Sequence, residues 1–217
     1  MKIAIIGGTG KEGKGLAYRW AKAGHKVTIG SRQFEKAQHI AEELNMEKQG
    51  IKPVSGLQNS DAAKQAELVV VTVPFAAHVA TLETIKDAVQ GKIVVDVTVP
   101  LVPPKVSTVH IPAAGSAAME AQSVLGEDTR VVSAFQNVSY EKLMDDNAQI
   151  SDVLVCGNDQ AAKNLVLQLI DDAGMKGFDA GALQNSIVSE GMTSVLININ
   201  KKFGVHSAGI KIIGLEE

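Results

Sequence analysis

The chain has 217 residues, of which 45% are hydrophobic and 21% charged, a composition typical of a globular protein with a substantial core. A formal net charge of -3 argues against general attraction to nucleic acid or acidic membranes, and 4% aromatic residues leave no stacking platform for single strands. No hydrophobic run approaches the roughly 20 residues that span a bilayer. We therefore expect small-molecule partners, with no nucleic acid and no membrane.

The single cysteine, Cys156, cannot form an intramolecular disulfide, and the N-terminus resembles a strand and turn more than a signal peptide. These features predict a cytoplasmic protein. Cys156 ends a hydrophobic run, so we expect a buried structural thiol and not a nucleophile.

The first element is a strand over residues 2–7 that leads into a glycine-rich turn. The turn has the spacing G-x-G-x-x-G, with glycines at Gly8, Gly10 and Gly13. Gly8 allows the tight turn, Gly10 lets the backbone approach a pyrophosphate, and Gly13 lets the next helix pack closely. That helix, residues 14–23, directs the positive end of its dipole at the phosphates. The turn predicts dinucleotide binding, against the alternative of an ordinary glycine-rich connection.

Short β-branched runs then alternate with helical segments as far as residue 135, which is typical of βαβ units. Because these strands are almost continuously hydrophobic, both faces of the sheet should be buried, as in a doubly wound parallel α/β sheet of the Rossmann type. The expected strands are residues 2–7, 26–30, 53–55, 68–73, 92–97 and 130–135, and the expected helices are residues 14–23, about 34–44, a helix begun at residues 60–61, and 76–89.

After residue 135 the pattern weakens and then resumes as a smaller C-terminal α/β region. We expect an NADP-binding Rossmann domain over residues 1–150 and a region over 151–217 that completes the substrate site and forms an oligomer interface, with one continuous domain as the alternative. The hydrophobic segment 192–203 suits either a dimer seam or a core helix. The elements expected here are strands 152–157 and 176–179 and helices 160–173 and 192–199.

The second strand ends at Ser31 and Arg32, where an NAD-specific site would have an acidic residue for the ribose hydroxyls. An acid there would repel a 2'-phosphate, whereas a hydroxyl beside a guanidinium attracts one. Lys36, one helical turn later, adds a second positive charge. The pattern favours NADP(H). The alternative is that Ser31 caps the helix and that Arg32 and Lys36 are solvated surface charges.

The residues that follow strands four, five and six should line the substrate side of the cavity. Hardly any of them exchanges a proton near neutral pH, and no paired carboxylates indicate a metal site, so we expect no catalytic acid or base and no metal. Asp96 and His78 are expected to be buried, hydrogen-bonded structural groups. Four of the six prolines follow strand five and predict a stiff, apolar loop over the active face: Pro100, Pro103, Pro104 and Pro112.

An uncharged, apolar site beside a nicotinamide suits direct hydride transfer between two flat redox rings, in which the protein positions the reactants. The chain resembles the F420-dependent NADP oxidoreductases, which are NADPH-dependent reductases of the deazaflavin coenzyme F420. The resemblance covers essentially the full length, and its segments are residues 5–17, 30–36, 131–138, 155–159 and 209–212.

The resemblance implies reversible hydride transfer between NADP(H) and F420 in a homo-oligomer, taken to be a homodimer. It implies that Thr9, Ser31, Arg32 and Lys36 bind NADPH. It also implies that the deazaflavin lies against the nicotinamide near Pro74, Val99, Gln136, Val138 and Thr193. Motif and resemblance together give this cofactor-binding set: Gly8, Thr9, Gly10, Lys11, Glu12, Gly13, Ser31, Arg32, Lys36, Val73, Pro74, Val99, Gln136, Val138 and Thr193.

Two positions depart from the family pattern. Some members carry histidine where this chain has Gln136, and many carry arginine where it has Ile187. An NADPH-dependent reductase of another acceptor, such as a flavin or ferric complex, is therefore one alternative function. A non-catalytic NADP(H)-binding regulator is the second.

Overall fold

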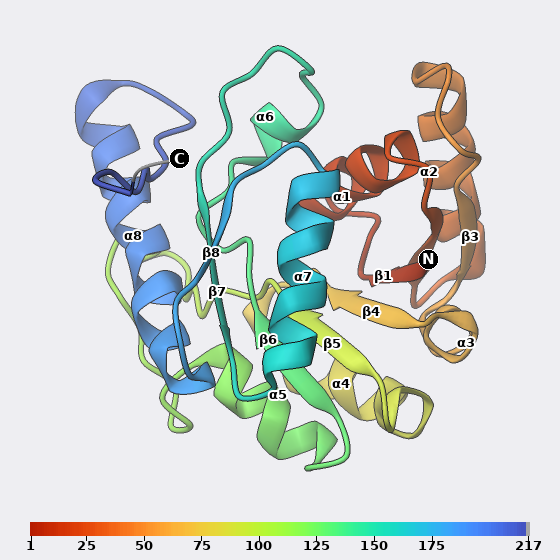
Figure 1. Cartoon of the computed structure of the whole chain (residues 1–217), viewed down its shortest axis with the longest axis horizontal. Helices are drawn as coiled ribbons and strands as arrows, with labels where there is room; N and C mark the ends of the chain where they lie inside the picture. Colours follow the sequence, from red (N-terminus) through yellow and green to blue (C-terminus); the bar gives the residue numbers. More distant parts are fainter. Residues whose placement is uncertain (216–217) are drawn as a thin grey trace.

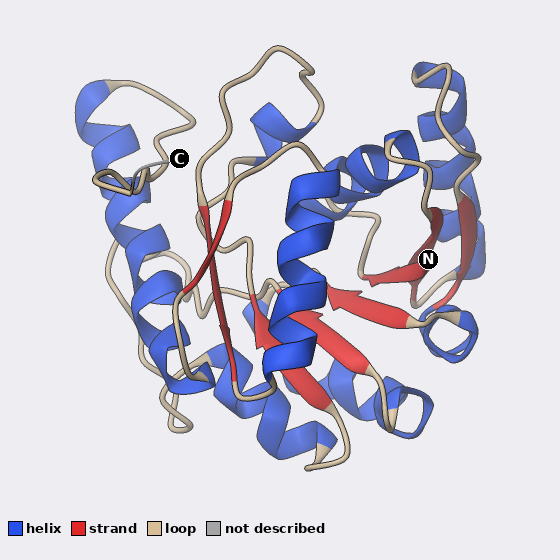
Figure 2. Ribbon diagram, viewed as in Figure 1, coloured by secondary structure: helices blue, strands red, loops and turns tan. Residues whose placement is uncertain are grey.

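The computed structural model describes residues 1–215, in which eight strands form one sheet in the order β3-β2-β1-β4-β5-β6-β7-β8 (Figures 1 and 2). The first six strands along the chain pair in parallel, which confirms the predicted Rossmann-type architecture. The strands are β1 (Lys2–Ile6), β2 (Lys26–Ser31), β3 (Ser55–Gln58), β4 (Leu68–Val71), β5 (Ile93–Asp96), β6 (Arg130–Ser133), β7 (Val153–Gly157) and β8 (Gly177–Asp179).

Alternate residues of each strand face opposite sides of the sheet, so each side has its own hydrophobic core. Ile3 and Ile5 of β1 pack with α1, α2 and α7, whereas Ala4 and Ile6 pack with α3, α4 and α5. Figure 1 shows α7 crossing one face of the sheet and α4 lying behind the other. The helices are α1 (Lys11–Lys22), α2 (Phe34–Glu47), α3 (Asn59–Gln65), α4 (His78–Ile85), α5 (Ala117–Leu125), α6 (Tyr140–Leu143), α7 (Gln160–Asp172) and α8 (Ser186–Phe203), with 3-10 turns η1 (Phe75–Ala77), η2 (Lys86–Val89) and η3 (Leu183–Asn185).

Several element boundaries differ from expectation. Helix α1 begins at Lys11, three residues earlier than predicted, so the last glycine of the turn lies inside it. The predicted helix 76–89 is broken into η1, α4 and η2. Helix α5 had no counterpart among the predicted elements, although Ser116 caps it by accepting a hydrogen bond from the Met119 N–H.

The C-terminal elements extend the same sheet. Strand β7 pairs with β6 in antiparallel orientation, and β8 pairs with β7 in parallel. Helix α8 lies at the side of the molecule and packs against α5 and β7 (Figure 1). Its range is longer at both ends than the predicted helix 192–199.

Strands β1 and β4 are neighbours in the sheet, although they are not consecutive in the chain. The strand order reverses here, with β2 and β3 on one side and β5 onward on the other. Connections from the two strands leave in opposite directions and open a crevice at their carboxyl ends, the general location of ligand sites in such sheets.

Candidate functional site

A cavity of about 810 Å³ occupies this crevice. Five connections contribute to it: the turn after β1, the segment after β2, the start of α3, and the connections that follow β4 and β5. Its lining residues are Gly7, Thr9, Gly10, Lys11, Glu12, Ser31, Arg32, Gln33, Lys36, Asn59, Thr72, Val73, Pro74, Phe75, Ala76, Ala77, Thr81, Val97, Thr98, Val99, Leu101, Pro103 and Val106.

Each glycine of the turn after β1 is required for a different reason. Gly7, one residue before the predicted tight-turn position, has the left-handed backbone, with φ 72°. A Cβ on Gly8 would lie 2.7 Å from the Ile5 carbonyl oxygen, and one on Gly13 would lie 2.5 Å from Gly8 Cα. By contrast, a Cβ on Gly10 would meet nothing closer than 3.8 Å, at the Gly7 carbonyl oxygen. The open space at Gly10 faces the cavity, which suits the close approach of a pyrophosphate.

Helix α1 starts directly at this open space. Its N-cap is Gly10, and no side chain caps it. The N–H groups of a first helical turn have no partner within the helix, so here they are available to an anionic ligand. The positive end of the helix dipole adds to this attraction.

The predicted phosphate-binding residues lie together at the end of β2. Ser31 is buried, and its Oγ accepts a hydrogen bond from the Gln33 N–H at 3.2 Å, so it shapes the turn and does not cap α2. Arg32 and Lys36 are exposed at the cavity wall, and neither has a hydrogen-bond or ion-pair partner among residues 1–215. Two unneutralised cations beside a hydroxyl form a suitable site for a phosphate monoester.

Asn59, at the start of α3, also lines this end of the cavity. Its Oδ1 accepts a long hydrogen bond, 3.5 Å, from the Gly7 N–H. A Cβ at Gly30 would come within 2.9 Å of the same oxygen. Gly30 and Asn59 therefore fit together, and they fix the β2 end against the glycine turn.

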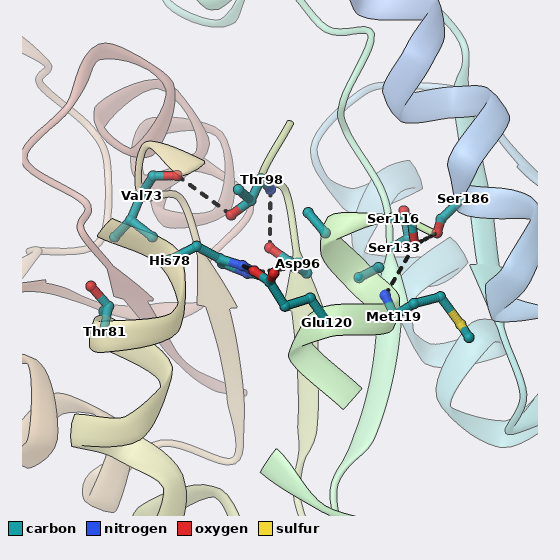
Figure 3. Close-up of polar contacts among 12 residues, drawn as sticks. Val73, His78, Thr81, Asp96, Thr98, Ser116, Met119, Glu120, Ser133 and Ser186 are labelled. Atoms are coloured by element: carbon teal, nitrogen blue, oxygen red, sulfur yellow. Dashed lines mark hydrogen bonds and ion pairs between the residues drawn. The ribbon is translucent and has the colours of Figure 1, made fainter. Parts of the chain in front are cut away.

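At the other end of the cavity, the connections after β4 and β5 contact each other. The Thr98 hydroxyl donates to the Val73 carbonyl at 3.4 Å, and the Thr98 N–H donates to Asp96 Oδ1 at 3.0 Å (Figure 3). Pro74 and Val99 give this end an apolar surface. Leu101, Pro103 and Val106 of the proline-rich connection complete the wall, as the sequence predicted for that loop.

A buried ion cluster lies beneath this surface. His78 Nε2 lies 2.9 Å from Asp96 Oδ2, and its Nδ1 lies 2.9 Å from Glu120 Oε1 (Figure 3). Burial alone lowers the pKa of His78, but hydrogen bonds to Asp96 and Glu120 and their negative charges outweigh it and raise the pKa to about 9. His78 is thus an imidazolium that joins α4, β5 and α5, the structural role expected for it.

Gln136, Asn137 and Thr193 form a second polar group next to the ion cluster. Gln136 Nε2 donates to the Asp96 carbonyl at 2.8 Å, and the Thr193 hydroxyl donates to the Gln136 carbonyl at 2.8 Å. Asn137 Nδ2 donates to Thr193 Oγ1 at 3.1 Å. Gln136 Oε1 is buried and has no hydrogen-bond partner in the described part of the chain. This oxygen is free to accept a hydrogen bond from a ligand.

Helix α8 is tied to α5 by a carboxylate that the sequence analysis missed. Glu190 Oε2 accepts from the Ala117 N–H at 2.7 Å, and its Oε1 accepts from the Ala118 N–H at 3.1 Å. Burial raises the pKa of Glu190 to about 7, although the two N–H groups oppose the shift. Ser186 of α8 also donates to Ser116, the N-cap of α5, at 2.7 Å (Figure 3). These contacts hold Thr193 in place, because it lies one turn after Glu190.

Ten of the fifteen predicted cofactor-binding residues line the cavity: Thr9, Gly10, Lys11, Glu12, Ser31, Arg32, Lys36, Val73, Pro74 and Val99. Gly8 and Gly13 lie behind the wall and shape the turn. Gln136, Val138 and Thr193 are outside the lining. Gln136 is connected to the lining residue Thr98 through Asp96, and Thr193 is bonded to Gln136. Thr98 also lines the cavity, as expected for a residue that follows strand five. Thr72 and Asn59 were not predicted, although each directly follows a strand whose carboxyl end faces the crevice.

Cys156 is buried, and burial raises the pKa of its thiol to about 11, which suits a structural thiol. Within residues 1–215, no three His, Cys, Asp or Glu side chains are grouped to hold a metal ion. None of the helices in that range is both long and apolar enough to cross a bilayer.

Comparison with known proteins gives consistent matches. Residues 2–100 match the family model described as NADP oxidoreductase coenzyme F420-dependent. The chain is 42% identical to the F420-dependent NADP reductase of Methanocaldococcus jannaschii and 38% identical to that of Methanothermobacter marburgensis, in each case over 100% of both proteins. A crystal structure from Arthrobacter sp. FB24, assigned as an F420-dependent NADP reductase, superposes with a TM-score of 0.84 at 29% identity, covering 99% of this chain and 100% of that one.

Proposed function

The chain belongs to the F420-dependent NADP oxidoreductase family, and we propose that its cavity is where a hydride passes between NADP(H) and coenzyme F420. The chain spans the whole length of its curated relatives, so the activity in their names concerns a protein of the same extent. When both carriers are bound, the chemistry is transfer of a hydride between the nicotinamide and the central ring carbon of the deazaflavin. The protein holds the two rings face to face.

The nucleotide half of the proposal rests on the shape and charge of the cavity. The α1 N-terminus and the space at Gly10 would hold the pyrophosphate, and Ser31, Arg32 and Lys36 would hold the 2'-phosphate. A volume of about 810 Å³ lies within the range typical of cofactor and small-molecule pockets. Arg32 and Lys36 carry the preference for NADP(H) over NAD(H), because only the former has a phosphate to neutralise them.

The acceptor half rests on the apolar end of the cavity. We propose that Pro74 and Val99 support the nicotinamide and that Gln136, Val138 and Thr193 lie near the deazaflavin. The free Oε1 of Gln136 supports this placement, since it offers an acceptor to the N–H groups of a deazaflavin ring. The hydride step itself needs no acid or base, because the hydride moves directly between two carbons, and solvent can supply the proton that the reduced deazaflavin takes up on its ring nitrogen.

We propose that the two ends of the cavity belong to two parts of the chain. Residues 1–150 bind the dinucleotide, and residues 151–217 complete the acceptor side, with α8 supplying Thr193. We further propose that the protein is a cytoplasmic homodimer. The exposed apolar side chains of α8 support a dimer, because a surface of this kind is typical of an interface: Val188, Val195, Ile199 and Phe203.

The full-length identity of 42% to a named reductase is the observation that carries the proposed function. Purified protein should bleach the deazaflavin absorbance of oxidised F420 when NADPH is added, at a rate proportional to protein concentration. FMN and FAD serve as parallel acceptors. Faster NADPH oxidation with a flavin than with F420 would replace the proposal by a flavin reductase, and binding of NADPH without turnover of any acceptor would replace it by a binding protein.

A further inference from the structure

Glu12 is a half-buried side chain in the cavity wall that the proposed chemistry does not use. It lies in the first turn of α1, and its Oε1 is buried with no hydrogen-bond partner among residues 1–215. Burial raises the pKa of this carboxyl to about 8, and no charged side chain in that range contributes to the shift. A buried carboxyl oxygen without a partner is costly, so a ligand that places a positive charge beside it would stabilise the ionised form of Glu12.

The place of Glu12 along the cavity follows from its neighbour. A Cβ on Gly13 would lie 2.8 Å from Thr72 Oγ1, so the first turn of α1 packs against the end of β4. Val73 and Pro74 directly follow Thr72 and line the same cavity. Strand β1 separates β4 from β2, where the phosphate-binding side chains lie. A dinucleotide with its adenosine over β2 and its pyrophosphate on α1 would extend its nicotinamide over β4, next to Glu12.

The two lysines next to Glu12 in α1 interact with other side chains. Lys11 Nζ donates to the Tyr140 hydroxyl at 3.3 Å. Lys14 of α1 is paired with Glu43 and Glu47 of α2, at 2.7 and 2.9 Å.

Arg32 and Lys36 line the adenosine end of the cavity and make no bond to Glu12. The charge that would complement a Glu12 carboxylate is therefore missing among residues 1–215.

The oxidised nicotinamide ring carries a positive charge, and the reduced ring is neutral. We propose that Glu12 is a specificity-determining residue that makes this site bind NADP+ more tightly, relative to NADPH, than a neutral side chain would. The inference rests on the proposed function, since it requires NADP(H) in this cavity. When a hydride leaves the nicotinamide, a C–H bond breaks there and one forms on the acceptor carbon. The nicotinamide ring becomes a cation, the acceptor ring gains the hydride and takes up a proton from solvent on a ring nitrogen, and the Glu12 carboxyl releases its proton to solvent.

The test is calorimetric titration of the full-length protein with NADP+ and with NADPH between pH 6.5 and 9. The ratio of the two Kd values is used, because both cofactors carry the same 2'-phosphate and its titration cancels. For the wild type, Kd(NADP+)/Kd(NADPH) should fall as the pH rises toward 8 and then level off. NADP+ binding should release a proton, measured by repeating the titration in buffers of different ionisation enthalpy.

Glu12→Gln keeps the size of the side chain and removes the charge. At pH 8.5 it should raise Kd(NADP+)/Kd(NADPH) about tenfold, remove the pH dependence and abolish proton release. A tenfold change corresponds to a rise of about 30 mV in the potential of the bound two-electron couple. Glu83→Gln, an exposed acid on α4, is the matched control and should change neither quantity.

An unchanged Kd ratio in a folded Glu12→Gln protein that still binds both cofactors would overturn the inference and leave the proposed function standing. Failure of the wild type to bind either cofactor would overturn the proposed function itself. If Glu12→Gln does not fold, the wild-type titrations decide. A flat Kd ratio with no proton release would overturn the inference, and a falling ratio with proton release would support it.

Discussion

His78 and Asp96 form an ion pair with an Nε2–Oδ2 distance of 2.9 Å, and neither side chain is exposed to solvent. The pair has a direct connection to the cavity, because the other Asp96 oxygen accepts the Thr98 N–H and the Asp96 backbone carbonyl accepts the Gln136 amide. The ion pair therefore fixes the position of Thr98, in the connection after β5, relative to Gln136, in the connection after β6.

We expect His78→Gln to destabilise the protein by about 3 kcal/mol near neutral pH, since it leaves a buried carboxylate without its cation. The pKa of His78 rises from 6.5 in the unfolded chain to about 9 in the folded protein. Its contribution is thus fully present below about pH 6.5 and is lost as the pH rises through 9. Urea denaturation between pH 6 and 9.5 should show the wild type losing stability over this range, and His78→Gln losing much less. His39 is an exposed histidine on α2, and the stability of His39→Gln should depend on pH as that of the wild type does. Parallel stability curves for all three proteins would contradict the assignment of the pH dependence to His78.

Two glycine substitutions should separate folding from binding. Gly10→Ala should fold with a Tm near that of the wild type, because its Cβ enters open space, but it should weaken NADPH binding at least tenfold by blocking the phosphate. Gly13→Ala should lower the Tm, since its Cβ would lie 2.5 Å from Gly8 Cα. Thermal unfolding and NADPH titration measure the two effects. Equal losses of Tm in the two variants would mean that Gly10 also has a packing role.

Arg32→Ala should weaken NADPH binding about ten- to a hundredfold and leave NADH binding nearly unchanged, because a charge-assisted hydrogen bond to the 2'-phosphate is worth about 1.5 to 3 kcal/mol. Titration of both cofactors measures the selectivity. Lys86→Ala removes an exposed cation that is not part of the cavity lining and should affect neither cofactor. If Arg32→Ala weakened both cofactors equally, Arg32 would be an ordinary surface charge.

Val195→Asp should convert the proposed dimer into a monomer. Val195 is 45% exposed on the same helix as Val188, Ile199 and Phe203, and an aspartate at the centre of an apolar interface would be buried without a partner. Light scattering with size-exclusion chromatography measures the mass of each protein. Val79→Asp, at a site 38% exposed on α4, should keep the wild-type mass, and a monomeric wild type would contradict the proposed dimer.

More of the residues predicted for nucleotide binding than of those predicted for the acceptor line the cavity, for a physical reason. The glycine turn, Ser31, Arg32 and Lys36 belong to short local patterns in which backbone geometry and charge are visible within a few residues. The family resemblance then extended the prediction to the apolar end. Neither source indicated that Glu190 caps α5, because that contact joins residues 72 and 73 positions apart.

Fold features that depend on residues far apart in the sequence were likewise not predicted. Strand β7 was predicted from its hydrophobic run. Its antiparallel pairing with β6 was not predicted, because the direction of pairing depends on the path of the chain between the two strands and not on the residues of the run. Helix α5 did have a local signal that could have been used, in the N-cap Ser116 followed by Ala117, Ala118 and Ala121.

Direct transfer between the two rings is the central claim, and isotope labelling tests it most directly. NADPH carrying deuterium at the transferable C4 position should be mixed with the protein and oxidised F420, and the reduced F420 analysed by mass spectrometry. The account predicts that reduced F420 gains the deuterium on its central ring carbon, and that unlabelled NADPH in deuterated water gives no label there. Reduced F420 whose carbon-bound hydrogen comes from solvent, or no reduction at all, would contradict it.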